Sequence, residues 1–86
     1  MKEVKLFYLR ECPFCKKAFR YIQQAKEKHP ELAQVEIELI EESEQVEVAN
    51  SYDYYYVPTF YVAGEKVHEG GIFPDEVEQI LRQALE

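Results

Sequence analysis

The order of hydrophobic and polar positions predicts a strand, a helix and a second strand in the first half of the chain. Residues 4–9 are almost continuously apolar, which is typical of a strand that lies inside a sheet and is buried on both faces. Apolar residues recur at helical spacing over residues 13–28, and Pro30 ends this helix. Over residues 35–39 apolar positions alternate with glutamates, which predicts a strand with one solvated face.

The second half predicts a short helix, a hairpin and a last helix. Ser43 is a candidate cap for a helix that ends near residue 51, with Val46 and Ala49 facing inward. Strands at residues 59–62 and 66–69 flank a turn at 63–65. Pro74 then opens a helix with an apolar stripe that continues to the end of the chain.

These elements give the order β-α-β-α-β-β-α. A strand, a helix and a second strand form a right-handed unit with parallel strands. We therefore expect an α/β fold with a four-stranded mixed sheet and helices on both faces. With 86 residues, the chain is expected to form one domain over residues 1–86. Reactive groups are expected at the carboxyl end of the first strand.

Composition narrows the function classes. The net charge of −7 argues against a nucleic-acid partner. The sequence has no leader-like apolar run and no stretch suited to a membrane span. We expect a cytoplasmic protein, because a reducing cytosol suits cysteines that cycle between thiol and disulfide. We also expect a monomer.

The two cysteines, Cys12 and Cys15, are separated by Pro13 and Phe14 at the start of the first helix. Pro13 suits the first helical position, which places Cys12 at the N-cap. Free backbone N–H groups and the helix dipole there favour the thiolate form of Cys12. Two thiols at this spacing can close and reopen a disulfide, so we expect Cys12 to attack a substrate and Cys15 to resolve the mixed disulfide.

Three other interpretations of the cysteine pair remain open. A structural disulfide over so short a loop would remove little entropy from the unfolded chain. A zinc site needs about four ligands, which two chains could supply by pooling their thiols into a zinc or iron–sulfur site. The third interpretation is a non-catalytic adaptor that leaves its thiols idle.

Basic residues surround the cysteine pair. Arg10 precedes it, and Lys16, Lys17 and Arg20 follow it. Cations oppose the dipole in the first turn of a helix, so their presence there favours a functional role. They would stabilise the Cys12 thiolate or attract an anionic substrate. The alternative is an ordinary solvated helix face.

The chain resembles the thioredoxin-fold superfamily and, within it, the glutaredoxins. Three motifs carry this resemblance: Cys12-Pro13-Phe14-Cys15 followed by Lys16-Lys17-Ala18, then Val57-Pro58-Thr59, then Gly70-Gly71. The resemblance implies a dithiol oxidoreductase that reduces protein disulfides or glutathione mixed disulfides, with no bound metal or prosthetic group. It also implies a cis Val57–Pro58 bond that presents the Val57 backbone to an extended substrate.

The same resemblance implies a substrate groove around Cys12. It would be lined by Val57-Pro58-Thr59 and Gly70-Gly71, together with Arg10, Pro13, Phe14 and Lys16. The electron donor stays open between glutathione and a thioredoxin-reductase-type protein, because the chain departs from both patterns. Leu9 stands where glutaredoxins carry a cation, and Leu6 stands where thioredoxins carry a buried aspartate.

Four tyrosines precede the Pro58 motif, at positions 52, 54, 55 and 56. Alternation along an extended segment would bury one or two of them. The remaining ones would be exposed and could form a contact surface for a protein partner. The sequence supports partner binding and core packing equally.

Overall fold

The apolar strand β1 (Val4–Tyr8) lies inside a four-stranded sheet, as its sequence predicts. The computed structural model describes residues 1–86. The strand order is β2-β1-β3-β4, with β2 at Ile37–Glu41, β3 at Thr59–Val62 and β4 at Glu65–Glu69. Strands β1 and β2 are parallel, and the other two pairs are antiparallel. The expected mixed sheet is therefore confirmed.

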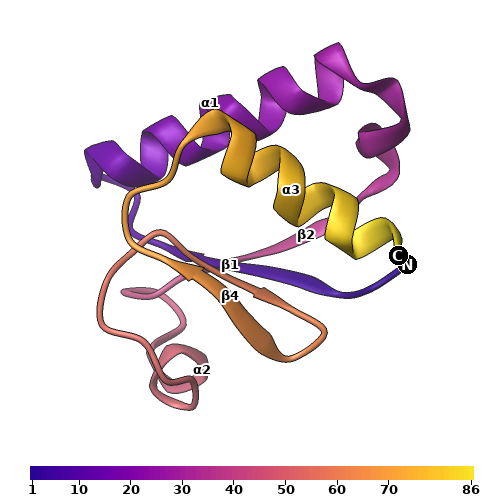
Figure 1. Ribbon diagram of the computed structural model, residues 1–86. Coiled ribbons are helices and arrows are strands. Elements are labelled where there is room, and N and C mark those ends of the chain that lie inside the picture. Colours follow the sequence, from indigo (N-terminus) through magenta and orange to yellow (C-terminus); the bar gives the residue numbers. More distant parts are fainter.

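Helices cover both faces of the sheet. Helices α1 (Pro13–Lys28) and α3 (Pro74–Leu85) lie side by side on one face, and the short α2 (Val46–Asn50) lies on the other (Figure 1). A 3₁₀ helix at Pro30–Gln34 connects α1 to β2. None of these helices combines the length and the apolar character that a membrane span requires.

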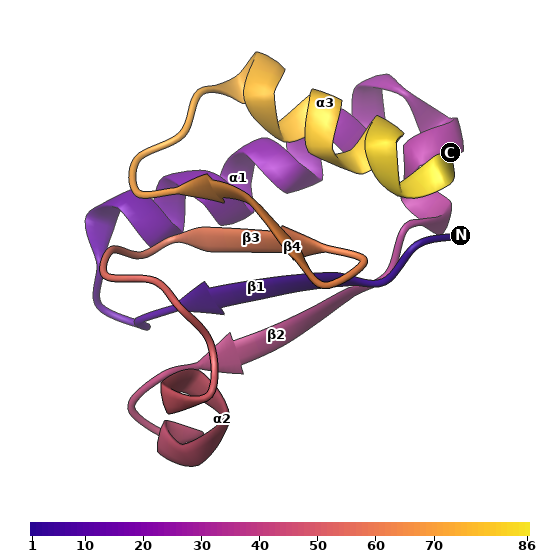
Figure 2. The same cartoon turned by 60° about the horizontal axis from the view of Figure 1, so that its bottom comes forward.

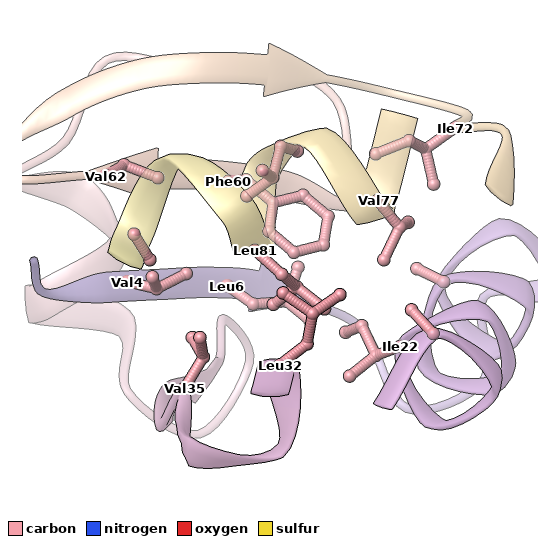
Figure 3. Packing of buried hydrophobic residues seen from close by; sticks show 14 residues of the cluster. Val4, Leu6, Ile22, Leu32, Val35, Phe60, Val62, Ile72, Val77 and Leu81 are labelled. Carbon is pink, nitrogen blue, oxygen red and sulfur yellow. The ribbon is translucent and has the colours of Figure 1, made fainter. Parts of the chain in front are cut away.

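The larger hydrophobic core lies between the sheet and the helices α1 and α3 (Figure 3). Leu6 from β1, Phe60 from β3 and Leu81 from α3 are all fully buried in it. Ile22 on α1 and Val77 on α3 pack against the same cluster. The apolar stripes of the two long helices therefore face the sheet, as their spacing predicts.

A smaller core covers the opposite face of the sheet. Phe7 and Tyr61 from the sheet pack there with Ile40, and the rings of Tyr52 and Tyr54 each lie 4.8 Å from the Phe7 ring, centroid to centroid. Aromatic pairs at this separation stabilise a core beyond the area that they bury. Two of the four tyrosines are thus packing residues.

Strand β2 differs from its expected pattern. Leu39 is 45% exposed, whereas Ile40 and Glu41 are buried. The cause is position, because β2 is an edge strand and lies at the border of the layer formed by α1 and α3. The buried Glu41 carboxylate is satisfied by the backbone N–H of Arg10 at 2.9 Å and by both polar groups of Ser43.

Ser43 does not cap α2, so this expectation is wrong. Its hydroxyl donates to Glu41 Oε1 at 2.6 Å, and the helix begins at Val46 with Gln45 as its N-cap. Val46 is half exposed, and Ala49 alone faces the core as expected. A serine hydroxyl can bond to several nearby groups, and here the Ser43 hydroxyl bonds to the Glu41 carboxylate instead of to the start of α2.

The hairpin turn is one residue shorter than expected. Strand β4 begins at Glu65, because Ala63 and Gly64 both have positive φ angles, 51° and 83°. Two such residues form the tight turn whose twist matches the flanking strands.

The two ends of the chain meet far from the β1–α1 turn. The Lys2 N–H donates to the Ala84 carbonyl at 2.7 Å, and both termini lie at the opposite end of the sheet (Figure 2).

A matched pair of leucine substitutions tests this account of the core. Leu81→Ala should lower the free energy of unfolding by roughly 2–5 kcal/mol, because it leaves a cavity in the larger core. Leu39→Ala removes the same atoms from a half-exposed site and should cost less than about 1 kcal/mol. Denaturant unfolding measures both, and equal losses would contradict the assigned burial.

Candidate active site

The cysteine pair lies where β1 turns into α1. The Cys12 N–H donates to the Leu9 carbonyl at 3.1 Å, and the Cys12 carbonyl accepts the first helical bond, from Lys16 N–H at 3.0 Å. Cys12 is the N-cap of α1, with extended backbone angles, and Pro13 follows it in the first turn. The N–H groups of Phe14 and Cys15 donate to no backbone carbonyl. The helix end therefore offers donors and a positive dipole to a charged sulfur.

The two thiols differ in accessibility. Both are free, Cys12 is partly exposed, and Cys15 is 1% exposed. Burial raises the pKa of the Cys15 thiol to about 12, and hydrogen bonding to the Cys12 sulfur acts in the same direction. Cys15 is therefore held as a neutral thiol behind an accessible sulfur.

The glycine pair connects the cysteine motif to the Pro58 loop. The Gly70 N–H donates to the Pro58 carbonyl at 2.8 Å. A Cβ at Gly71 would lie 3.4 Å from the Phe14 ring, in ordinary van der Waals contact, so the Gly71 backbone lies directly beside that ring. The fold thus brings together three motifs that are far apart in the sequence.

The Pro58 loop presents an unpaired stretch of backbone. The Val57–Pro58 bond is cis, as the resemblance implies. Neither the N–H nor the carbonyl of Val57 pairs with another backbone group. Pro58 and Thr59 are buried, and the Thr59 hydroxyl donates to the Tyr56 carbonyl. An unpaired N–H and carbonyl on an ordered loop can accept an added strand.

The nearby cations are engaged with other partners. The Arg10 guanidinium donates to Glu44 Oε2 at 2.7 Å, and this contact raises the Arg10 pKa. The Lys16 ammonium lies 3.8 Å from a Glu11 carboxylate oxygen, and the Lys17 ammonium lies 5.8 Å from the centre of the Phe14 ring.

Two acidic residues that sequence analysis missed belong to this region. Glu69 Oε2 accepts the N–H groups of Tyr55 at 2.5 Å and Tyr56 at 3.0 Å, and its other oxygen pairs with Lys66 at 2.7 Å. The Lys66 contact and the two N–H groups lower the Glu69 pKa to about 2. Glu69 thereby fixes the segment just before Val57, although nothing in the sequence distinguishes it from other surface glutamates.

Glu42 is the second missed residue. Its carboxylate accepts the Tyr54 hydroxyl at 2.7 Å and lines a cavity of about 340 Å³ together with Leu9. Burial, and to a lesser extent this hydrogen bond, raises the pKa of Tyr54.

The chain has no cluster of three His, Cys, Asp or Glu side chains that could hold a metal ion.

No family model and no curated protein matches the chain. Among solved structures, an uncharacterised thioredoxin-like protein from Clostridium perfringens has 21% identity and a TM-score of 0.70, over 98% of this chain and 71% of that one. A designed protein has 25% identity and a TM-score of 0.65, over 99% and 73%. The zinc-bound form of human ERp44 has 20% identity and a TM-score of 0.65, over 95% of this chain and 26% of that one.

Replacing Glu69 with glutamine tests its role in fixing the loop. Because the folded pKa of about 2 lies below the ordinary 4.5, the ionised carboxylate stabilises the protein fully above about pH 4.5. This stabilisation is lost as the pH falls from there to about 2. We expect Glu69→Gln to lower the thermal unfolding midpoint at neutral pH and to flatten its fall over that window.

Glu65→Gln, on the same strand, is the matched control, because the Glu65 side chain is exposed and forms no ion pair. It should leave the unfolding midpoint close to that of the wild type. Identical pH profiles for Glu69→Gln and wild type would show that the carboxylate does not hold the loop.

Proposed function

Given its thioredoxin-like fold, we propose that this protein is a thiol–disulfide oxidoreductase. One observation carries the proposal: the two thiols share the first turn of α1, one of them accessible and the other buried. A structural disulfide needs no such difference between its sulfurs. A redox pair needs this difference, because one sulfur attacks the substrate and the other attacks only after the mixed disulfide has formed.

The first step joins Cys12 to the substrate. The Cys12 thiolate attacks one sulfur of a substrate disulfide, so that a Cys12–substrate disulfide forms and the other substrate sulfur leaves as a thiolate. The free N–H groups of Phe14 and Cys15 and the positive end of the α1 dipole lie in the turn that Cys12 caps, where they can donate to a sulfur. The cations of Arg10 and Lys16 add to the positive potential around the motif, although each also contacts a glutamate.

The second step releases the reduced substrate. Cys15 loses its proton to solvent and attacks the Cys12 sulfur, which forms the Cys12–Cys15 disulfide and expels the second substrate thiolate. Two electrons have then passed from the protein to the substrate. The raised pKa of Cys15 keeps this thiol from competing for the substrate in the first step.

The substrate would lie along the loop that carries Pro58. The unpaired N–H and carbonyl of Val57 can pair with an extended backbone, while the buried side chains of Pro58 and Thr59 anchor the loop in the protein. The small Gly70-Gly71 pair and the side chains of Pro13 and Phe14 would line the groove beside Cys12.

Protein disulfides and glutathione mixed disulfides are the proposed substrates. Electrons would return from glutathione or from a thioredoxin-reductase-type protein. A glutathione carboxylate could recruit Arg10 only in competition with Glu44. The proposed setting is the cytoplasm, with the protein acting as a monomer and needing no metal or organic cofactor.

Turnover of a small glutathione mixed disulfide, coupled to glutathione, is the first test. We expect Cys12→Ser to abolish turnover, because it removes the attacking sulfur. Cys15→Ser should retain turnover in the glutathione assay, since glutathione itself can resolve the Cys12 mixed disulfide. Reduction of a protein disulfide with dithiothreitol, run in parallel, identifies a protein that needs a different donor. Inactivity of the wild type in both assays would contradict the proposal.

Alkylation gives an independent measure of the two thiols. At neutral pH, iodoacetamide should label Cys12 at least about tenfold faster than Cys15, because Cys15 is buried and its pKa is raised. Mass spectrometry of Cys15→Ser and Cys12→Ser separates the two sites. In denatured protein the two rates should converge, and faster labelling of Cys15 in the native state would reverse the assigned roles.

A further inference from the structure

Four large aromatic side chains around the candidate site are exposed, and only Phe14 among them has a place in the proposed groove. Phe14 is 55% exposed, Tyr56 and Phe73 are each 70% exposed, and Tyr55 is 86% exposed. Exposing such rings to water is unfavourable, and aromatic residues are enriched where proteins bind other proteins. We call these four residues the aromatic rim.

Two members of the rim, Phe14 and Tyr56, lie against the glycine pair. The Phe14 ring lies against Gly71, where a Cβ would meet it at 3.4 Å. The Tyr56 Cβ lies against Gly70 at 3.9 Å from the position of a Cβ there. Phe73 follows two residues after Gly71. Tyr56 therefore places one end of the rim beside the Pro58 loop, and Phe14 places the other within the cysteine motif.

Carboxylates fix the backbone beneath the rim. Glu69 accepts the N–H groups of both Tyr55 and Tyr56, and Glu76 Oε1 accepts the Phe73 N–H at 3.0 Å. A side chain on an ordered backbone loses less entropy when a partner covers it. The backbone that carries Tyr55, Tyr56 and Phe73 is thus fixed before any partner arrives.

We propose that the aromatic rim selects substrates in which apolar side chains flank the target disulfide within an extended polypeptide segment. The inference rests on the proposed oxidoreductase function and assigns its substrate class. The unpaired Val57 backbone would pair with the segment, and the rim would cover the side chains on either side of the substrate cysteine. A few aromatic anchors of this kind supply most of the energy of an interface.

Two other occupants fit the surface less well. Glutathione carries two carboxylates and no large apolar side chain, so it leaves the rings uncovered and approaches a protein of net charge −7. A second copy of the chain would bring a further −7 to the contact, and this repulsion opposes pairing. An extended apolar segment of another protein meets neither obstacle.

The test compares two disulfide-linked peptide dimers of equal length and charge, in which either leucines or serines flank the cysteine. Fully reduced protein is mixed with each dimer, and the second-order rate of peptide release is followed by chromatography. One protein dithiol yields one protein disulfide and two peptide thiols, so electrons balance without a donor. We expect the leucine peptide to react about tenfold faster than the serine peptide.

Variants then assign this preference to the rim. Phe73→Ser should bring the ratio of the two rates close to one, and Tyr56→Ser should reduce it in the same direction. Leu39→Ser is the control, because it removes an apolar side chain that is 45% exposed from β2, where no part of the rim lies, and it should retain the wild-type ratio. Thermal unfolding of each variant verifies that it is folded.

The outcomes separate this inference from the function on which it rests. If the wild type reduces neither peptide nor a glutathione mixed disulfide, the oxidoreductase function itself fails. If it reduces both peptides at equal rates, or if Phe73→Ser and Tyr56→Ser both keep the preference, the function stands and the rim has no role in selection. Sedimentation that shows a dimer broken by Phe73→Ser would assign the rim to a second copy and overturn the proposal.

Discussion

The burial of β1 on both faces is the constraint on which the rest of the structure depends. Leu6 and Phe7 are neighbours on β1, point to opposite faces and are both fully buried, so each face of the sheet needs its own cover. Helices α1 and α3 cover one face, and α2 together with Tyr52 and Tyr54 covers the other (Figure 1). Because β2 and β3 flank β1, the chain leaves the plane of the sheet after Tyr8, and the short connection to α1 carries Cys12.

The cover of the second face also shapes the candidate site. Within five residues the chain passes from Tyr52 and Tyr54, which pack on Phe7, to the exposed rings of Tyr55 and Tyr56. The alternation of side chains along an extended segment does not by itself stabilise this switch from buried to exposed tyrosines. Glu69 on β4 stabilises the switch, because its carboxylate accepts the successive N–H groups of Tyr55 and Tyr56. Packing in the smaller core and presentation of the Pro58 loop are therefore properties of one segment.

Local signals were enough to predict the helix that carries the thiols. The apolar spacing and Pro13 determined the bounds of α1 and the N-cap position of Cys12, because these depend on residues a few positions apart. The exposure of Leu39 was not predictable, since it depends on how far the helix layer extends over β2. Glu69 was missed for a similar reason, because its backbone partners lie 13 and 14 residues away.

The meeting of the two chain ends has a consequence for how this domain can be rearranged. The Lys2–Ala84 hydrogen bond brings the ends together on the side of the sheet remote from Cys12 (Figure 2). A short linker could therefore join the ends, and new ends could be opened at the Ala63–Gly64 turn, without breaking the path from β1 into α1. Such a circular permutant would keep the thiols and the Pro58 loop in place, while β4, Gly70-Gly71 and α3 would be synthesised before them instead of after them.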